Sequence, residues 1–138
     1  MSGTTKGGAV PETPKNTPLP PPTDPFLVHV RELALGYPEA FEDFPWGDRV
    51  FKVKGKIFVF AGIDKDGRSG MSVKLPESRH SALTFPGAVP TGYGLGKSGW
   101  VSIRFSGEAI PYALVDAWID ESYRAVAPKT LLRRLETV

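Results

Sequence analysis

Residues 92–100 read GYGLGKSGW, and they are the part of the sequence whose composition and spacing most resemble a site for chemistry. The three glycines of GLGKSG satisfy the dinucleotide-binding pattern G-x-G-x-x-G, and GKS is the ending of a phosphate-binding P-loop. A P-loop also requires a glycine at the position that Thr91 occupies here. The surrounding elements must therefore decide whether this segment binds a nucleotide.

A dinucleotide fingerprint lies between a strand and a helix, whose N-terminus receives the pyrophosphate. Here the proline-broken loop TFPGAVPTGYGLGKSG comes first, and WVSIRF, with the alternation typical of a strand, follows. This order excludes both nucleotide motifs. A protein-kinase glycine loop does precede a strand, but the chain is too short for a kinase and contains no H-R-D or D-F-G. The segment is interpreted as a flexible turn before a strand.

Other catalytic patterns are missing from the sequence. It has no cysteine, no G-x-S-x-G, and two histidines, His29 and His80, neither of which has a candidate nucleophile near it. Asp43 and Asp48 flank the sequence FPWG and could form an acid–base pair, but their position favours a role as turn acids. We therefore expect a protein that is not an enzyme and that needs no metal and no cofactor.

Local sequence signals predict an α+β domain with helices packed against one antiparallel sheet. A helix begins at Asp24-Pro25 and ends at Gly36, and a second helix spans residues 111–126. Between them lie strands that turn at Lys54-Gly55 and at the sequence DKDG, a short helix over residues 76–83, and the strand WVSIRF. The residues expected in the core are Val30, Leu33, Phe58, Phe60, Ile103, Leu114 and Trp118.

Composition divides the chain into a tail and one domain. Seven of the fourteen prolines fall within residues 1–25, a segment with almost no large apolar side chain, so residues 1–24 are predicted to be a disordered or polyproline-like tail. Residues 25–138 are predicted to be a single domain. No apolar run is long enough to span a membrane or to form the core of a signal peptide, and we expect a cytoplasmic monomer.

The net charge of +2 is unevenly distributed. Residues 48–104 contain ten lysines and arginines against four acids, which leaves an excess of acids in the flanks. A basic centre is typical of proteins with an anionic partner such as nucleic acid, although such an excess is often only a solvated surface.

Several segments resemble the MmcQ/YjbR family in both order and spacing. They are FPWGDRVFKVKGKIFVF, MSVKLP, GYGLGKSGW and DESYRAVAPK, and together the resemblance covers about residues 26–136. The third segment contains Gly94, Gly96 and Gly99, and these glycines make the loop more mobile than the family pattern requires. The resemblance implies a compact α+β domain with a frataxin-like or secretion-chaperone-like sheet. It also implies the DNA-binding "double wing" function with which the family is usually described.

On this resemblance we expect a non-enzymatic DNA-binding module that contacts phosphates through basic hairpins and through the glycine-rich loop. Tyr93 or Trp100 would stack on bases or wedge between them. The alternative from a different functional class is a protein- or peptide-binding adaptor, by analogy with chaperones of similar fold. The expected contact residues are Lys52, Lys54, Lys56, Arg68, Lys74, Tyr93, Lys97, Trp100 and Arg104.

Overall fold

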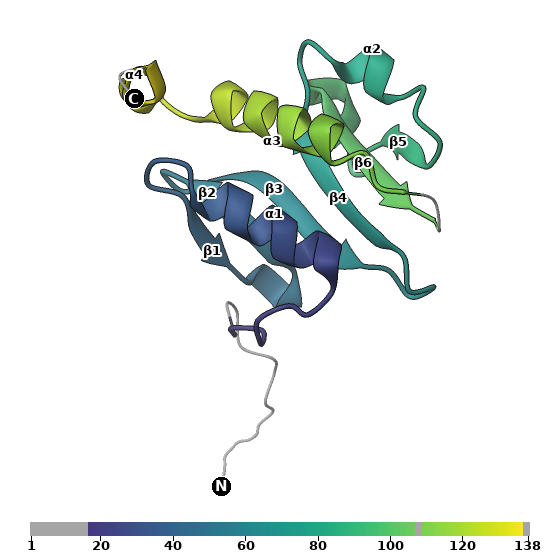
Figure 1. Cartoon of the computed structure of the whole chain (residues 1–138). Coiled ribbons are helices and arrows are strands. Elements are labelled where there is room, and N and C mark those ends of the chain that lie inside the picture. Colours follow the sequence, from purple (N-terminus) through teal and green to yellow (C-terminus); the bar gives the residue numbers. More distant parts are fainter. Residues whose placement is uncertain (1–16, 107–108, 137–138) are drawn as a thin grey trace, which may run out of the picture.

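The computed structural model describes residues 17–106 and 109–136, which form a six-stranded antiparallel sheet with helices on one face (Figure 1). The strand order is β1-β2-β3-β4-β6-β5. The strands are β1 (Phe41–Asp43), β2 (Arg49–Val53), β3 (Lys56–Ile63), β4 (Ser69–Lys74), β5 (Ala88–Pro90) and β6 (Trp100–Phe105). The helices are α1 (Pro25–Leu35), α2 (Arg79–Ala82), α3 (Tyr112–Val126) and α4 (Lys129–Glu136), with 3₁₀ turns η1 (Pro45–Gly47) and η2 (Leu95–Ser98).

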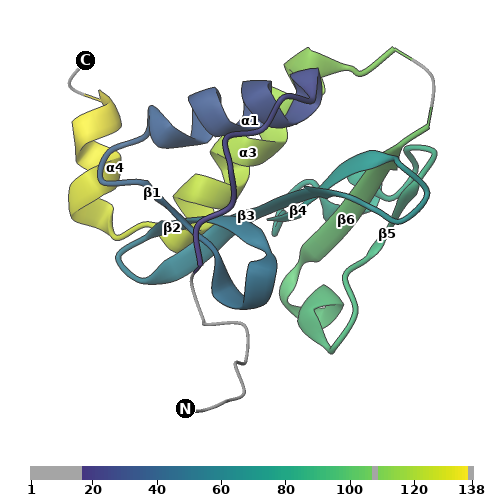
Figure 2. The same cartoon turned by 90° about the horizontal axis from the view of Figure 1, so that it is seen from below.

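The layers of the domain are clearest in Figure 2. Helices α1 and α3 lie on one side of the sheet, while the turn between β1 and β2 and the turn that precedes β6 project to the other side. The predicted α+β class is therefore confirmed, and so is the exclusion of a parallel βαβ sheet. We call the sheet face that lies away from α1 and α3 the open face.

Helix α1 begins where the sequence predicts it. The Asp24 Oδ2 atom accepts a hydrogen bond from the backbone N–H of Leu27 at 3.1 Å, and Pro25 occupies the first turn, where its missing N–H costs nothing. The helix ends at Gly36, also as predicted. Phe26, Val30 and other apolar residues of α1 are buried against the sheet.

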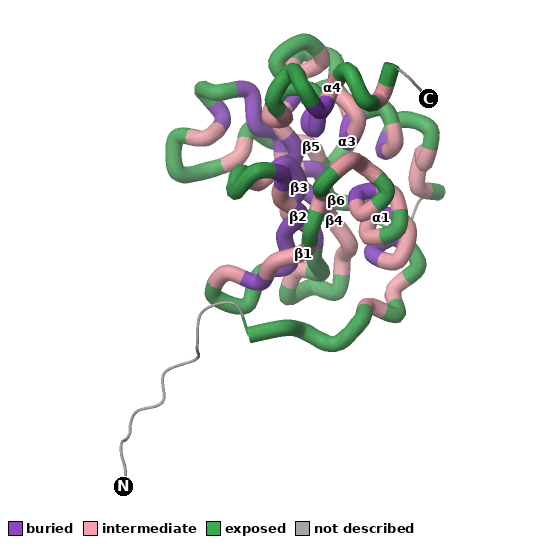
Figure 3. Tube along the Cα trace, turned by 90° about the vertical axis from the view of Figure 1, so that its left-hand side faces the viewer, coloured by how far each residue is buried: buried purple, intermediate pink, exposed green. Residues whose placement is uncertain are grey.

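The core lies between the helices and the inner face of the sheet. Cross-strand registers align Val59 with Val73 and Val101, and all three side chains are fully buried. Figure 3 shows that the buried stretches follow the strands, while the peripheral loops are exposed. Each fully buried Val, Ile or Phe side chain contributes about 1.5–3 kcal/mol, so this layer is the main source of stability.

Helix α3 corrects one expected core residue, because Leu114 is 46% exposed. The buried positions of α3 are Val115, Trp118, Ile119, Ser122 and Tyr123, a spacing of three and four residues that places position 114 outside the apolar stripe. Leu33 and Phe60 are half-buried, whereas Val30, Phe58, Ile103 and Trp118 are buried as expected.

Ser122 is a buried polar residue that the sequence pattern did not identify. Its hydroxyl donates to the Phe58 carbonyl at 2.6 Å and accepts from the Lys74 backbone N–H at 2.8 Å. The pairing of β2 with β3 shifts register between Phe51 and Lys52, and Phe58 has no partner residue in β2. Ser122 therefore donates a hydrogen bond to the Phe58 carbonyl, at a position where the irregular pairing provides no β2 partner.

Both predicted turns are present. Lys54 and Gly55 have φ values of 50° and 79°, which are typical of a two-residue hairpin turn of type I′. In the turn between β3 and β4, the backbone N–H of Asp64 donates to the Arg68 carbonyl, and the Asp64 carbonyl accepts from the Gly67 N–H. The predicted short helix is confined to α2, and the segment expected to be a loop contains the strand β5 and the turn η2.

The N-terminal segment contacts the domain before α1 begins. Residues 17–23 have no regular secondary structure, and the Pro20 carbonyl accepts a hydrogen bond from Arg49 Nη2 at 2.7 Å. Leu19 and Pro20 line a small hollow together with Leu27 and Ile63. Of the predicted tail over residues 1–24, residues 1–16 lie outside the described residues.

Candidate functional site

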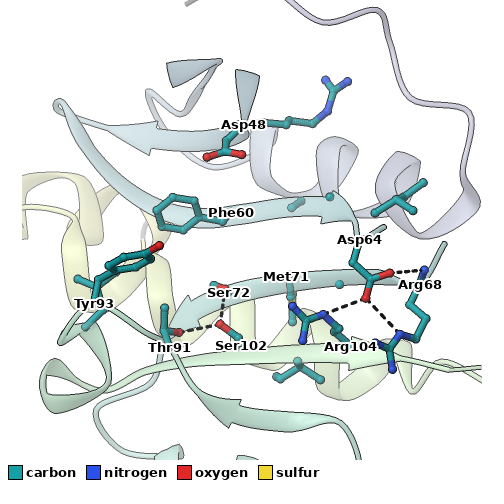
Figure 4. Close-up of a pocket in the computed structure, with 17 residues that line it drawn as sticks. Asp48, Phe60, Asp64, Arg68, Met71, Ser72, Thr91, Tyr93, Ser102 and Arg104 are labelled. Carbon is teal, nitrogen blue, oxygen red and sulfur yellow. Dashed lines mark hydrogen bonds and ion pairs between the residues drawn. The ribbon is translucent and has the colours of Figure 1, made fainter. Parts of the chain in front are cut away.

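The open face carries a groove of about 490 Å³, a volume within the range of small-molecule sites (Figure 4). Strand register orders its floor into two neighbouring rows. One row aligns Phe60, Ser72 and Ser102, and the next aligns Gly62, Gly70 and Arg104. Because side chains two residues apart along a strand share a face, both rows point away from the helices.

Hydroxyl groups form the polar centre of the groove. The Ser102 Oγ atom lies 2.7 Å from Ser72 Oγ and 2.9 Å from Thr91 Oγ1, so three hydroxyls share one chain of hydrogen bonds. Each hydroxyl carries one donor and two acceptor positions. The chain therefore retains capacity to hydrogen-bond a ligand that enters the groove.

An aromatic group closes one end of the groove. The rings of Phe60 and Trp100 meet edge to face, with 5.7 Å between centroids. Tyr93 is fully exposed and has a φ of 58°, an uncommon conformation for a residue with a Cβ. Figure 4 draws Tyr93 and Phe60 at the same end of the groove.

Trp100, one of the two rings expected to stack on or wedge between bases, is buried. Its side chain is 8% exposed, since it opens strand β6 and packs against Phe60 on the sheet. A base could not stack on an indole ring that the protein already covers. Tyr93 therefore remains as the exposed ring of the two that were expected to stack.

The glycine-rich segment is a compact turn in which several backbone amides already have internal acceptors. The backbone N–H groups of Gly96, Lys97 and Gly99 donate to carbonyls within residues 91–96. A Cβ on Gly96 would lie 2.9 Å from the Pro90 Cβ, so a larger residue would not fit there. These amides are therefore not available to a phosphate, and β6 rather than a helix follows the turn, in agreement with the rejection of both nucleotide motifs.

Charged side chains occupy the opposite end of the groove. Asp64 Oδ2 lies 3.1 Å from Arg104 Nε and 3.1 Å from Arg68 Nε. Asp64 Oδ1 accepts the backbone N–H groups of Asp66 and Arg68, each at 2.9 Å. The N–H of Arg68 lowers the pKa of Asp64 most strongly, followed by the N–H of Asp66 and the Arg68 guanidinium.

The lowered pKa of Asp64 gives a pH prediction. A depressed pKa in the folded state adds stability that is fully present above the unfolded value, near 3.8, and is lost as the pH falls through the folded value. Asp64→Asn should therefore melt below the wild type at pH 7. The melting temperatures of the two proteins should converge well below pH 3.8. A difference in melting temperature as large there as at pH 7 would contradict the assignment.

Two of the predicted hairpin lysines are held in ion pairs. Lys52 Nζ lies 2.7 Å from Asp43 Oδ2, and Lys54 Nζ lies 2.7 Å from Glu39 Oε1. Lys54 is in the turn rather than in a strand, so the three hairpin lysines do not line one strand face. Lys56 is exposed at the start of β3.

The remaining predicted cations lie closer to the groove. Arg68 and Arg104 line it, and Lys97 is exposed on η2. Lys74 is aligned with Trp100 and lies two residues beyond Ser72, which places its side chain on the open face. Within residues 17–106 and 109–136, no ion pair involves Lys56, Lys74 or Lys97.

Sequence reasoning missed the hydroxyls of Ser72, Thr91 and Ser102, and it missed Asp64 as a partner of the arginines. Strand alternation could have identified Ser72 and Ser102, because each is a polar residue between buried apolar neighbours. Asp64 and Arg104 are far apart in sequence, and only the strand register brings them together.

Two of the residues considered for catalysis, Asp43 and His29, have charged partners in the structure. Asp43 pairs with Lys52, which is the largest cause of its lowered pKa, while Asp48 lies at the edge of the groove. His29 lies 2.6 Å from Asp116 and against the Tyr112 ring, on the helical side. In the described part of the chain, no three His, Asp or Glu side chains gather as a metal site would require.

No helix among the described residues is both long and apolar enough to cross a membrane. The fold and the groove define a two-layer α+β domain with one covered and one open sheet face. The chain belongs to the YjbR family, whose sequence pattern matches residues 35–125. The resemblance carried by the sequence motifs is thereby confirmed.

Among solved structures, the chain is similar to a crystal structure of a protein from Pseudomonas syringae, determined as a structural-genomics target. The TM-score is 0.53 at 20% sequence identity, and the match covers 70% of this chain and 94% of the other. At this identity the likeness establishes the fold alone. None of the curated proteins matches the chain.

Proposed function

We propose that this protein is a non-enzymatic nucleic-acid-binding module that holds an unpaired strand against the open face. The observation that carries the proposal is the fully exposed ring of Tyr93 at the same end of the groove as Phe60, with Arg104 at the other end (Figure 4). Bases stack on exposed aromatic rings, and phosphates bind the cations on either side.

The ion pairs shift the expected phosphate contacts away from the hairpin. Lys52 and Lys54 would have to exchange Asp43 and Glu39 for a phosphate, so their net contribution is small. Lys74 and Lys97 have no such partner among the described residues and lie nearer to the aromatic end of the groove. A single strand fits this arrangement better than a duplex, because the stacking rings need unpaired bases.

Fluorescence anisotropy with short single-stranded and duplex DNA, titrated over a range of salt concentrations, tests the proposal. Tyr93→Ala should weaken single-strand binding by about 1–3 kcal/mol, because one stacked base loses its ring. Since Tyr93 is fully exposed, its removal should leave the fold intact. Leu114→Ala, an exposed apolar residue on α3, is the matched control and should bind as the wild type does.

The lysines are tested by the slope of affinity against salt. Lys74→Ala and Lys97→Ala should each reduce that slope by roughly 0.7 units on single strands, whereas Lys54→Ala should change it less. An absence of binding at about 50 mM salt and micromolar protein would defeat the proposal, because even non-specific phosphate binders associate there.

A protein- or peptide-binding adaptor is the second candidate, and a specific observation favours it. Apolar side chains such as Phe60 and Leu95 line part of the groove, and several of the basic residues are neutralised by acids. Binding to extended peptides that depends on the groove residues and is insensitive to salt would move this candidate to first place.

A further inference from the structure

Arg104 is held in a defined position on the floor of the groove. A Cβ on Gly70 would lie 2.7 Å from the Ile103 carbonyl oxygen and 3.4 Å from Arg104 Cγ, so the arginine stem occupies space that a side chain on β4 would need. The absence of a side chain at Gly70 lets Arg104 lie across its neighbouring strand.

Asp64 orients the guanidinium of Arg104. Its carboxylate contacts Nε at 3.1 Å, and the turn amides hold that carboxylate in place. No further ion pair within residues 17–106 and 109–136 engages the Arg104 guanidinium, so its two terminal nitrogens remain for a ligand. Two parallel N–H donors match the geometry of a phosphate.

The sheet sets where Arg104 lies relative to the row of hydroxyls and to the aromatic end of the groove. Ser102 and Arg104 are two residues apart on β6, which places their rows about 7 Å apart along the strand. Phe60 lies in the Ser102 row but on β3, two strands from β6, which adds about 10 Å across the sheet. A nucleotide that reaches both Phe60 and Arg104 must therefore lie diagonally across the groove. Between the two ends lie the hydroxyls of Ser72, Thr91 and Ser102.

We propose that the groove is a site for one nucleotide unit, with its base between Tyr93 and Phe60 and its phosphate on the terminal nitrogens of Arg104. The base edge would meet the hydroxyls of Ser102 and Thr91. Because a hydroxyl both donates and accepts, this contact tolerates any of the bases. Asp64 is a positioning residue that acts through Arg104.

This inference rests on the proposed function. The same site could bind a nucleotide from either of two sources. The unit is either a free mononucleotide or one nucleotide of an unpaired strand. The test therefore uses adenosine monophosphate, adenosine, inorganic phosphate and a short single-stranded oligonucleotide as separate probes, each titrated against the full chain and followed by NMR shifts and calorimetry.

Arg104→Gln should weaken binding of adenosine monophosphate about tenfold or more, because a charge-assisted hydrogen bond is lost, and should leave adenosine binding unchanged. Tyr93→Ala should weaken binding of both compounds. Arg133→Gln, which removes an exposed arginine from α4, is the charge-matched control and should alter neither. Arg104→Lys keeps the charge but lacks the paired donors, so its affinity for adenosine monophosphate should lie between those of the wild type and of Arg104→Gln.

The outcomes separate the two claims. Equal losses for the monophosphate and for adenosine in Arg104→Gln, or no binding of the monophosphate at all, would overturn the nucleotide site. If the oligonucleotide still binds in that case, the proposed function survives without it. If the monophosphate binds as described and the oligonucleotide binds no more tightly, the site takes free nucleotides and the strand-binding function fails.

Discussion

Replacement of Trp100 by alanine is expected to lower the free energy of unfolding by about 3–5 kcal/mol. The indole is 8% exposed and packs edge to face on Phe60, so its removal leaves a cavity at the start of β6. Urea denaturation measures the loss. Trp46→Ala is the matched control and should cost less, since that side chain is 67% exposed. Equal stability of the two variants would show that Trp100 is not part of the packed structure.

The same substitution separates a structural role from a binding role. Trp100→Ala should weaken nucleic-acid binding only to the extent that it unfolds the domain or displaces Phe60. In Trp100→Phe, which retains a ring beneath Phe60, binding should stay close to wild type. A binding loss in this variant larger than that in Tyr93→Ala would instead place the indole against the ligand.

Glu42→Ala is expected to cost about 3–5 kcal/mol, because it leaves a buried guanidinium without its counter-charge. Arg49 is 7% exposed, and its Nη1 donates to Glu42 while its Nη2 donates to the Pro20 carbonyl. Glu42 also accepts from Arg31 at 3.1 Å. The loss should appear in urea or thermal unfolding.

A double-mutant cycle with Arg49→Met checks the cause of that loss. In the Arg49→Met background, the cost of Glu42→Ala should shrink, since no buried charge remains to be left unpaired. Additive costs would mean that Glu42 acts through Arg31 or through the local backbone instead. Because Arg49 also anchors Pro20, either single change should loosen the contact of residues 17–23 with the domain.

Much of the fold follows from short-range features of the sequence. The cap at Asp24-Pro25, the stop at Gly36 and the Lys54-Gly55 turn each involve a few neighbouring residues, and all three are where they were predicted. The prediction that Leu114 is buried was wrong because two adjacent apolar residues can both fit a helical apolar stripe. Only the packing of α3 determines that Val115 is the buried one. Strand β5 was missed because it has three residues and ends in a proline.

The candidate site was less predictable because it depends on pairs distant in sequence. The groove is lined by three of the predicted contact residues, Tyr93, Arg68 and Arg104. A count of charges in the sequence, however, cannot show which lysines and arginines already have an acidic partner and which are free to bind a phosphate. The partners of Lys54 and Arg104 are 15 and 40 residues away, and such pairs are set by strand register. Trp100 was misjudged for the same reason, since its cover comes from Phe60 on another strand.

The lengths of the outermost strands limit how this protein can meet other chains. Both β1 and β5 are three residues long, and β5 ends at Pro90, which has no N–H to donate to a further strand. Short or proline-ended edges are poor templates for the strand-by-strand addition that produces aggregates and swapped dimers. A partner should therefore dock through side chains rather than by extending the ladder of backbone hydrogen bonds.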